Sequence, residues 1–177
     1  FSLQQYYRDI RIFALYEGTT GIQSQDLLGR KVTMENGKGL QLLYAEILIT
    51  IIAASNDENL KPYATILGEK LKLSEKILGH LMPFAMKGNY ERYLADANLF
   101  MEYLSTVVLG WLWLEMAVDA KRELDNADRK YSETFYESKI HTMKFYFKYE
   151  VPKTNSLAES LMSDEVLTIK NEKEYII

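Results

Sequence analysis

Two long stretches of this chain repeat apolar residues with the period of an α-helix. Residues 60–86 carry a continuous apolar stripe, and residues 90–124 are expected to form one helix. The middle of the second stretch, Val107 to Leu114, is apolar on every side and should be the most buried segment. The 177 residues contain three prolines and nine glycines, too few for a sheet of short strands. The sequence predicts an all-α fold, an up-and-down bundle of about five to seven helices.

Shorter helical patterns and breaks complete the expected bundle. Helices are predicted over residues 40–55, 131–149 and 156–162. Residues 34–39 read Met-Glu-Asn-Gly-Lys-Gly, a polar linker that is the best candidate for a domain boundary. Pro83 is expected to kink or loosen the last turn of the helix that contains it.

A polar turn separates the first two helical patterns of the chain. It reads Tyr16-Glu17-Gly18-Thr19-Thr20-Gly21-Ile22-Gln23. Thr19 or Thr20 is a good N-cap for the helix that follows, because a hydroxyl can accept a free backbone N–H there. Gly18 and Gly21 permit backbone conformations that other residues avoid, and they allow a ligand to approach the main chain. An isolated E-G-T tripeptide is most often a simple connection between helices with a solvated glutamate. A chemical role can therefore be assigned only if a longer stretch of sequence matches a known family.

The longer string around this turn resembles the acyl-CoA dehydrogenase family near the end of its catalytic region. The matching residues are Arg8-Asp9-Ile10-Arg11-Ile12, the turn itself, and Leu27-Leu28-Gly29-Arg30-Lys31. The resemblance implies a flavin enzyme that desaturates a fatty acyl thioester between its α and β carbons. It also implies FAD as cofactor, acyl-CoA as substrate, an electron-transfer flavoprotein or similar acceptor, and a homo-oligomer.

The same resemblance assigns roles to residues of the turn. Glu17 occupies the position of the base that removes the α proton, a task that suits a weakly solvated carboxylate with a raised pKa. The backbone N–H of Gly18 would reach the thioester carbonyl and stabilise the enolate oxygen. Thr19, Thr20 and Gly21 match the positions that contact FAD. Many family members carry a side-chain amide where this chain has Gly21, so a contact there would have to come from the backbone.

A second resemblance covers the later part of the chain. Its motifs are Asn98-Leu99-Phe100-Met101-Glu102-Tyr103-Leu104, Leu109-Gly110-Trp111-Leu112-Trp113 and Phe135-Tyr136-Glu137-Ser138-Lys139-Ile140. They look like the C-terminal extension of a larger subgroup that includes enzymes similar to 3-methylmercaptopropionyl-CoA dehydrogenase. This implies an added helical bundle rather than a second active site. The expected division is the end of the catalytic helical domain at 1–35, the extension domain at 36–163 and a tail at 164–177.

Composition narrows the classes of function. A net charge of −4 gives no basic surface for nucleic acid, and the absence of cysteine excludes disulfides, thiolate metal sites and cysteine nucleophiles. Absence of cysteine also fits a reducing compartment, and a cytoplasmic location is expected. With two histidines and no Glu-x-x-His pair, no metal site is predicted. The weakly polar run between Glu102 and Glu115 is shorter than the roughly 20 residues that cross a bilayer, so no membrane span is expected.

The chain begins at Phe1, without an initiating methionine or a visible signal sequence. With the resemblance, this suggests the C-terminal piece of a longer enzyme, inactive alone. Helices that pack on neighbours outside such a piece are expected to expose apolar faces. Two other interpretations stay open from the sequence. One is a non-catalytic helical module that holds subunits together, and the other is an acyl-CoA oxidase, which passes electrons to oxygen.

Overall fold

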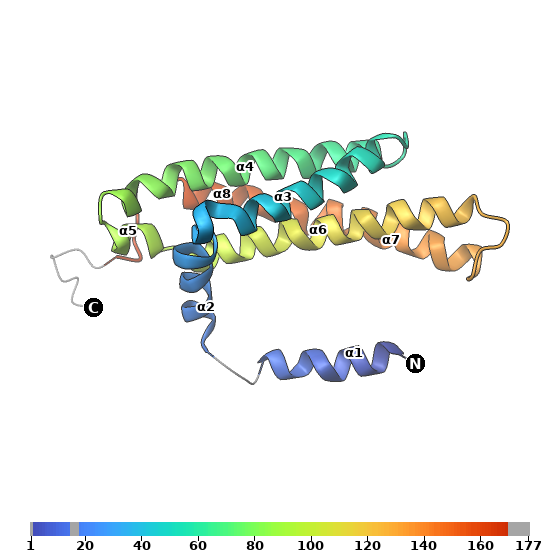
Figure 1. Cartoon of the computed structure of the whole chain (residues 1–177), viewed down its shortest axis with the longest axis horizontal. Helices are drawn as coiled ribbons and strands as arrows, with labels where there is room; N and C mark the ends of the chain where they lie inside the picture. The colour runs from blue at the N-terminus through green and yellow to red at the C-terminus, as the bar shows by residue number, and fades with distance from the viewer. Residues whose placement is uncertain (1, 15–17, 170–177) are drawn as a thin grey trace.

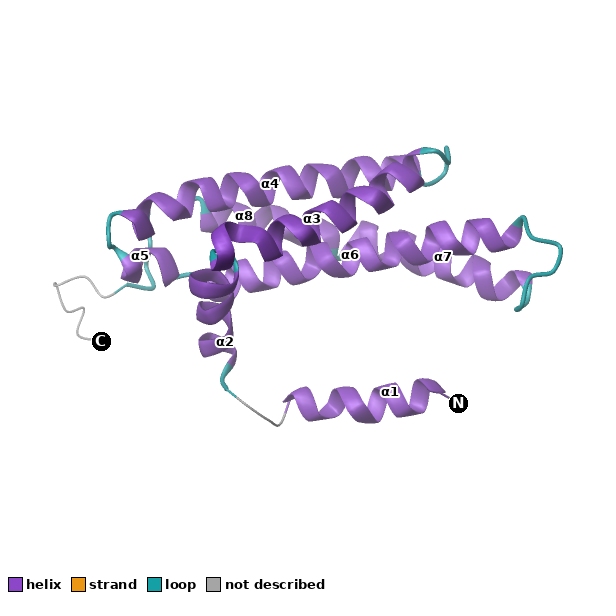
Figure 2. Ribbon diagram, in the orientation of Figure 1, coloured by secondary structure: helices purple, strands orange, loops and turns teal. Residues whose placement is uncertain are grey.

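The chain folds into a helical bundle, described in a computed structural model for residues 2–14 and 18–169. Within those residues every regular element is helical and no strand occurs (Figure 2). Four long helices lie side by side with their axes along the length of the molecule (Figure 1). They are α3 (Met34–Ser55), α4 (Lys61–Met86), α6 (Ala97–Leu124) and α7 (Glu133–Tyr149). The predicted all-α bundle is confirmed.

Shorter elements flank the long helices. Towards the N-terminus these are α1 (Ser2–Arg11), the 3-10 turn η1 (Ile12–Ala14), α2 (Thr20–Asp26) and the π-helical turn η2 (Leu27–Lys31). Later come α5 (Tyr90–Leu94), the 3-10 turn η3 (Val151–Lys153) and α8 (Thr154–Leu161). In Figure 1, α2 projects from one end of the bundle, and α1 lies apart from it. The main packing contact of α1 is with η1, whereas α2 and η2 both pack on α6.

The expectation of one helix over residues 90–124 is wrong. The chain leaves helical geometry at Asp96 (φ −109°, ψ 30°), and the backbone carbonyl of Asp96 accepts from the N–H of Leu99 at 3.0 Å to start α6. Before the break, the side chain of Asn89 caps α5 by accepting from the N–H of Arg92 at 3.1 Å. Asn and Asp favour helix ends because their side chains or backbones bond locally there. Asp96 therefore divides the stretch that the apolar pattern joined, and Asn89 marks where that stretch begins.

The segment Val107 to Leu114 is not buried on every side, contrary to expectation. Leu109 is 48% exposed and Leu112 is 37% exposed, although Val107 and Leu114 are in the core. The helices packed on α6 leave one strip of it open, and apolar composition alone does not show which strip. The bundle therefore presents apolar side chains of α6 to its outside.

The predicted breaks lie close to where helical geometry ends. Inside α3, Glu35, Asn36 and Gly37 take left-handed backbone conformations, so the helix is interrupted within the predicted linker at 34–39. The domain boundary placed there remains a prediction. Pro83 lies in the last turn of α4, which ends at Met86 with Lys87 as its C-cap, and Gly88 then adopts a positive φ of 77°.

Two of the helices, α3 and α6, are long and apolar enough to cross a membrane when judged by length and composition alone. Core helices of bundles pass the same test. Here the indole N–H of Trp111 on α6 donates to the hydroxyl of Thr50 on α3 at 2.8 Å, joining the two helices through polar groups. The expectation that the chain has no membrane span stays a prediction.

Buried tyrosines tie the long helices together. The hydroxyl of Tyr103 on α6 is fully buried and donates to the backbone carbonyl of Lys70 on α4 at 2.7 Å. The hydroxyl of Tyr44 on α3 bonds to that of Ser74 on α4. Burial raises the pKa of Tyr103 above the ordinary value of 10.0, and it raises the pKa of Tyr44 in the same direction.

These tyrosines predict a loss of stability at alkaline pH. Above about pH 10 an unfolded Tyr103 gives up its proton while the folded one keeps it, so the free energy of unfolding falls by up to about 1.4 kcal/mol per pH unit. Tyr103→Phe should remove this contribution and make the fall shallower, while costing about 1 kcal/mol at neutral pH through the lost hydrogen bond. Urea unfolding measured between neutral pH and about pH 11 checks this. An unchanged alkaline slope in the variant would contradict it.

Candidate functional site

The described part of the turn, residues 18–21, forms a compact entry into α2. Gly18 has a φ of +76°, in the left-handed region that favours glycine. Thr19 is extended (φ −84°, ψ 155°), and its hydroxyl oxygen accepts from the N–H of Ile22 at 3.4 Å. Of the two candidate caps, Thr19 is therefore the N-cap, and Thr20 is the first helical residue. Glu17, the proposed base, lies outside the described residues.

The predicted substrate-binding and cofactor-binding positions are accessible. Gly18, Thr19 and Thr20 are exposed, and Gly21 is half-buried. A Cβ atom built on Gly21 would have the Thr19 hydroxyl oxygen as its nearest neighbour, at 4.0 Å, so the backbone there can be approached closely. The structure therefore brings Gly18, Thr19, Thr20 and Gly21 together in one accessible turn.

Because Gly21 has helical geometry and space for a side chain, Gly21→Ala should stabilise the chain. Alanine loses less conformational freedom than glycine in a helix, which is worth about 0.5–1 kcal/mol. Thermal unfolding of the original chain and of the Gly21→Ala variant shows whether the substitution raises the unfolding temperature. A lower unfolding temperature in the variant would contradict the expected stabilisation.

Ser24 fixes α2 to the bundle. It is 1% exposed, and its hydroxyl donates to the side-chain oxygen of Asn98 on α6 at 2.5 Å and to the carbonyl of Gly21 at 2.8 Å. One hydroxyl hydrogen is shared between the two acceptors. The first turn of α2, directly after the exposed residues 18–20, is thereby linked to α6.

The π-helical turn η2 makes a second attachment. Leu28 is fully buried, and its backbone carbonyl accepts from the hydroxyl of Tyr93 on α5 at 2.6 Å. In this wider turn the N–H of Val32 bonds back to the carbonyl of Leu27 at 3.0 Å. A Cβ atom on Gly29 would lie 3.2 Å from a methyl carbon of Leu94, so glycine allows η2 and α5 to pack closely.

One ion pair lies on the outer side of this region. The guanidinium of Arg30 donates to both carboxylate oxygens of Asp26, at 2.5 Å and 2.9 Å. These hydrogen bonds hold the pKa of Asp26 below its ordinary value. The pair is exposed, so its contribution to stability is small and depends on salt. Asp26 is thus an ionised surface group and not a second candidate base.

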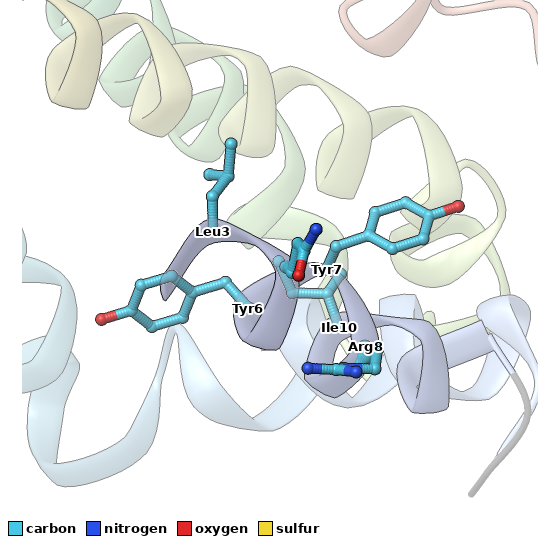
Figure 3. Close-up of a pocket in the computed structure, with 6 residues that line it drawn as sticks. Leu3, Tyr6, Tyr7, Arg8 and Ile10 are labelled. Carbon is cyan, nitrogen blue, oxygen red and sulfur yellow. The ribbon is translucent and has the colours of Figure 1, made fainter. Parts of the chain in front are cut away.

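The apolar face of α1 is uncovered. A cavity of about 730 Å³ lies beside it, lined by Leu3, Gln4, Tyr6, Tyr7, Arg8 and Ile10. Figure 3 shows Leu3, Tyr6 and Tyr7 spread in different directions around the helix. Each of these three side chains is more than half exposed. Such a surface is typical of a helix that packs on something outside the chain, as the sequence led us to expect.

Sequence reasoning missed the residues that attach the turn to the bundle. Ser24, Tyr93 and Asn98 were not among the candidate site residues, although Asn98 lies in a motif of the second resemblance. A serine inside a helix next to glycine-rich sequence signals little by itself. Within the described residues no group of three His, Asp or Glu side chains could hold a metal ion.

The structure is a helical bundle with an accessible Gly-Thr-Thr-Gly turn, residues 18–21, at one end. A family model described as "Acetyl-CoA dehydrogenase C-terminal like" matches residues 43–170. The chain therefore belongs to this acyl-CoA dehydrogenase C-terminal family, and the resemblance seen in its sequence is confirmed.

Three curated relatives are named acyl-CoA dehydrogenases. A broad-specificity linear acyl-CoA dehydrogenase of Mycobacterium tuberculosis is 28% identical over 93% of this chain, and a butyryl-CoA dehydrogenase of Syntrophomonas wolfei is 28% identical over 96%. A 3-methylmercaptopropionyl-CoA dehydrogenase of Ruegeria pomeroyi is 35% identical over 68%. The chain spans 28%, 28% and 20% of the length of these relatives. The first two alignments are long enough to include the turn.

Proposed function

We propose that this chain is the carboxy-terminal part of an FAD-dependent acyl-CoA dehydrogenase and supplies its catalytic base. The observation that carries the proposal is the string from Tyr16 to Gln23, which lies inside the alignments with named acyl-CoA dehydrogenases. The open backbone of the turn also favours it, because a substrate and a cofactor must both approach there. The enzyme works in the cytoplasm as a homo-oligomer, with an electron-transfer flavoprotein or similar acceptor.

Two residues of the chain transfer the α proton and stabilise the charge that develops on the thioester. The carboxylate of Glu17 takes the proton from the α carbon of the acyl thioester, and the bonding electrons move towards the thioester carbonyl. The backbone N–H of Gly18 donates to that carbonyl oxygen and stabilises its developing negative charge. When bound, FAD supplies the redox chemistry by accepting the hydride that leaves the β carbon.

The turn is suited to binding a cofactor because it is exposed and carries hydrogen-bond donors. The hydroxyls of Thr19 and Thr20 are exposed at the start of α2, and only one side-chain atom lies within 4 Å of a Cβ built on Gly21. These groups would hold part of the flavin. Because Gly18, Thr19 and Thr20 are exposed in the described structure, the 177-residue chain alone should neither retain FAD nor turn over acyl-CoA.

Purification of the whole protein tests the proposal. We expect a yellow protein from which acid releases FAD, and which loses its visible flavin absorbance when an acyl-CoA is added without oxygen. With an artificial electron acceptor it should turn over, and with oxygen alone it should form little hydrogen peroxide. Rapid peroxide formation would identify an oxidase instead. A colourless oligomer without turnover would overturn the enzymatic proposal and leave an assembly module.

A further inference from the structure

We infer that Tyr93 and Asn98, two residues of the bundle, position residues 18–21, the described turn whose Gly18 would bind the thioester carbonyl. This inference rests on the proposed function for its catalytic consequence, but its structural part does not. Asn98 and Tyr93 form hydrogen bonds with Ser24 and Leu28, which follow the turn in the chain. They act through Ser24 and Leu28, so they are positioning residues and not catalytic ones.

The first contact acts close to the turn. Ser24 lies one helical turn after Gly21 and bonds to its carbonyl at 2.8 Å, while the same hydroxyl bonds to Asn98 at 2.5 Å. Ser24 is almost completely buried, so water does not compete for these bonds. The pair fixes how far the first turn of α2 stands from α6.

The second contact acts further along the same helical path. Tyr93 is 2% exposed, and its hydroxyl donates to the Leu28 carbonyl at 2.6 Å, with the Met82 sulfur more distant at 3.5 Å. Between Leu28 and Thr20 lies about 12 Å of helix, at 1.5 Å per residue. A small rotation at Leu28 therefore displaces the turn at the far end, and Tyr93 restrains that rotation.

Together the two contacts hold the continuous helical path of α2 and η2 at two points, Ser24 in α2 and Leu28 in η2. Ahead of these two points, Thr19 accepts local bonds from the backbone N–H groups of Ile22 and Gln23. In acid–base catalysis a displacement of about 1 Å can cost on the order of 10²-fold in rate. The bundle thus determines the position of the turn.

The test compares two hydrogen bonds of the same kind. Tyr93→Phe removes the bond to Leu28 in η2, and Tyr103→Phe removes an equally buried bond to the Lys70 carbonyl at 2.7 Å, which joins α6 to α4. Likewise Asn98→Ala removes the partner of Ser24, and Asn155→Ala removes the partner of Lys70 at 2.6 Å. The two controls report what a structural loss alone does.

Two readouts separate the outcomes. In the 177-residue chain, hydrogen exchange of the Ile22 and Gln23 amides should speed up in Tyr93→Phe and Asn98→Ala and stay unchanged in the controls. In the whole flavoprotein, the same two variants should lower kcat by about 10-fold or more, with KM and flavin content unchanged. A double variant of Ser24→Ala with Asn98→Ala should be no worse than either single change.

Equal exchange and equal kcat in variants and controls would overturn the inference. If exchange is faster in the 177-residue variants but the whole wild-type protein has no turnover, the proposed function would be refuted, while the attachment of the turn would stand. Faster exchange with kcat unchanged in an active enzyme would also overturn the inference, because the turn would then move without consequence.

Discussion

Glu17→Gln in the whole protein should leave FAD bound and lower turnover by about 10²–10⁴-fold, the usual worth of a positioned general base. Glutamine keeps the size and polarity of the side chain but cannot take a proton. Steady-state turnover with an acyl-CoA, normalised to flavin content, measures the effect. Glu46→Gln, which changes an exposed carboxylate on α3, serves as the control and should retain full turnover. Retained turnover in Glu17→Gln would refute the role of the residue.

Phe100→Ala should destabilise the 177-residue chain by about 3–5 kcal/mol. The ring of Phe100 on α6 is fully buried in the core, so its removal loses apolar contact and leaves a cavity. Urea unfolding followed by the circular dichroism of the helices measures the change.

The matched control is Phe145→Ala on α7, because Phe145 is also a phenylalanine but is 53% exposed. Its effect should stay within about 0.5 kcal/mol. If both substitutions cost the same, the assignment of Phe100 to the core and Phe145 to the surface would be wrong.

The sequence predicted the helical bundle because apolar residues recur at helical spacing over most of the chain. It could not predict the break at Asp96, since the apolar pattern runs on through that residue. It also could not show that Leu109 and Leu112 face outward, because a helix that is apolar all round does not reveal which side its neighbours cover.

For the candidate site, too, the sequence predicted some features and could not predict others. Local signals predicted a cap at Thr19 or Thr20 and unusual backbone freedom at Gly18 and Gly21. The structure selects Thr19 as the cap and gives Gly18 the positive φ. The bond between Ser24 and Asn98 joins residues 74 positions apart, and only the folded bundle brings them together. The chemistry assigned to Glu17 comes from the resemblance to a family and not from periodicity or composition.

One single-turnover experiment tests the central claim most directly. The whole flavoprotein is mixed, without oxygen, with an acyl-CoA carrying either hydrogen or deuterium at its α carbon, and the loss of flavin absorbance is followed. Wild type should lose the absorbance rapidly, and more slowly with deuterium, while Glu17→Gln should keep its oxidised flavin. Loss of absorbance in Glu17→Gln at the wild-type rate, with the same isotope effect, would contradict the account.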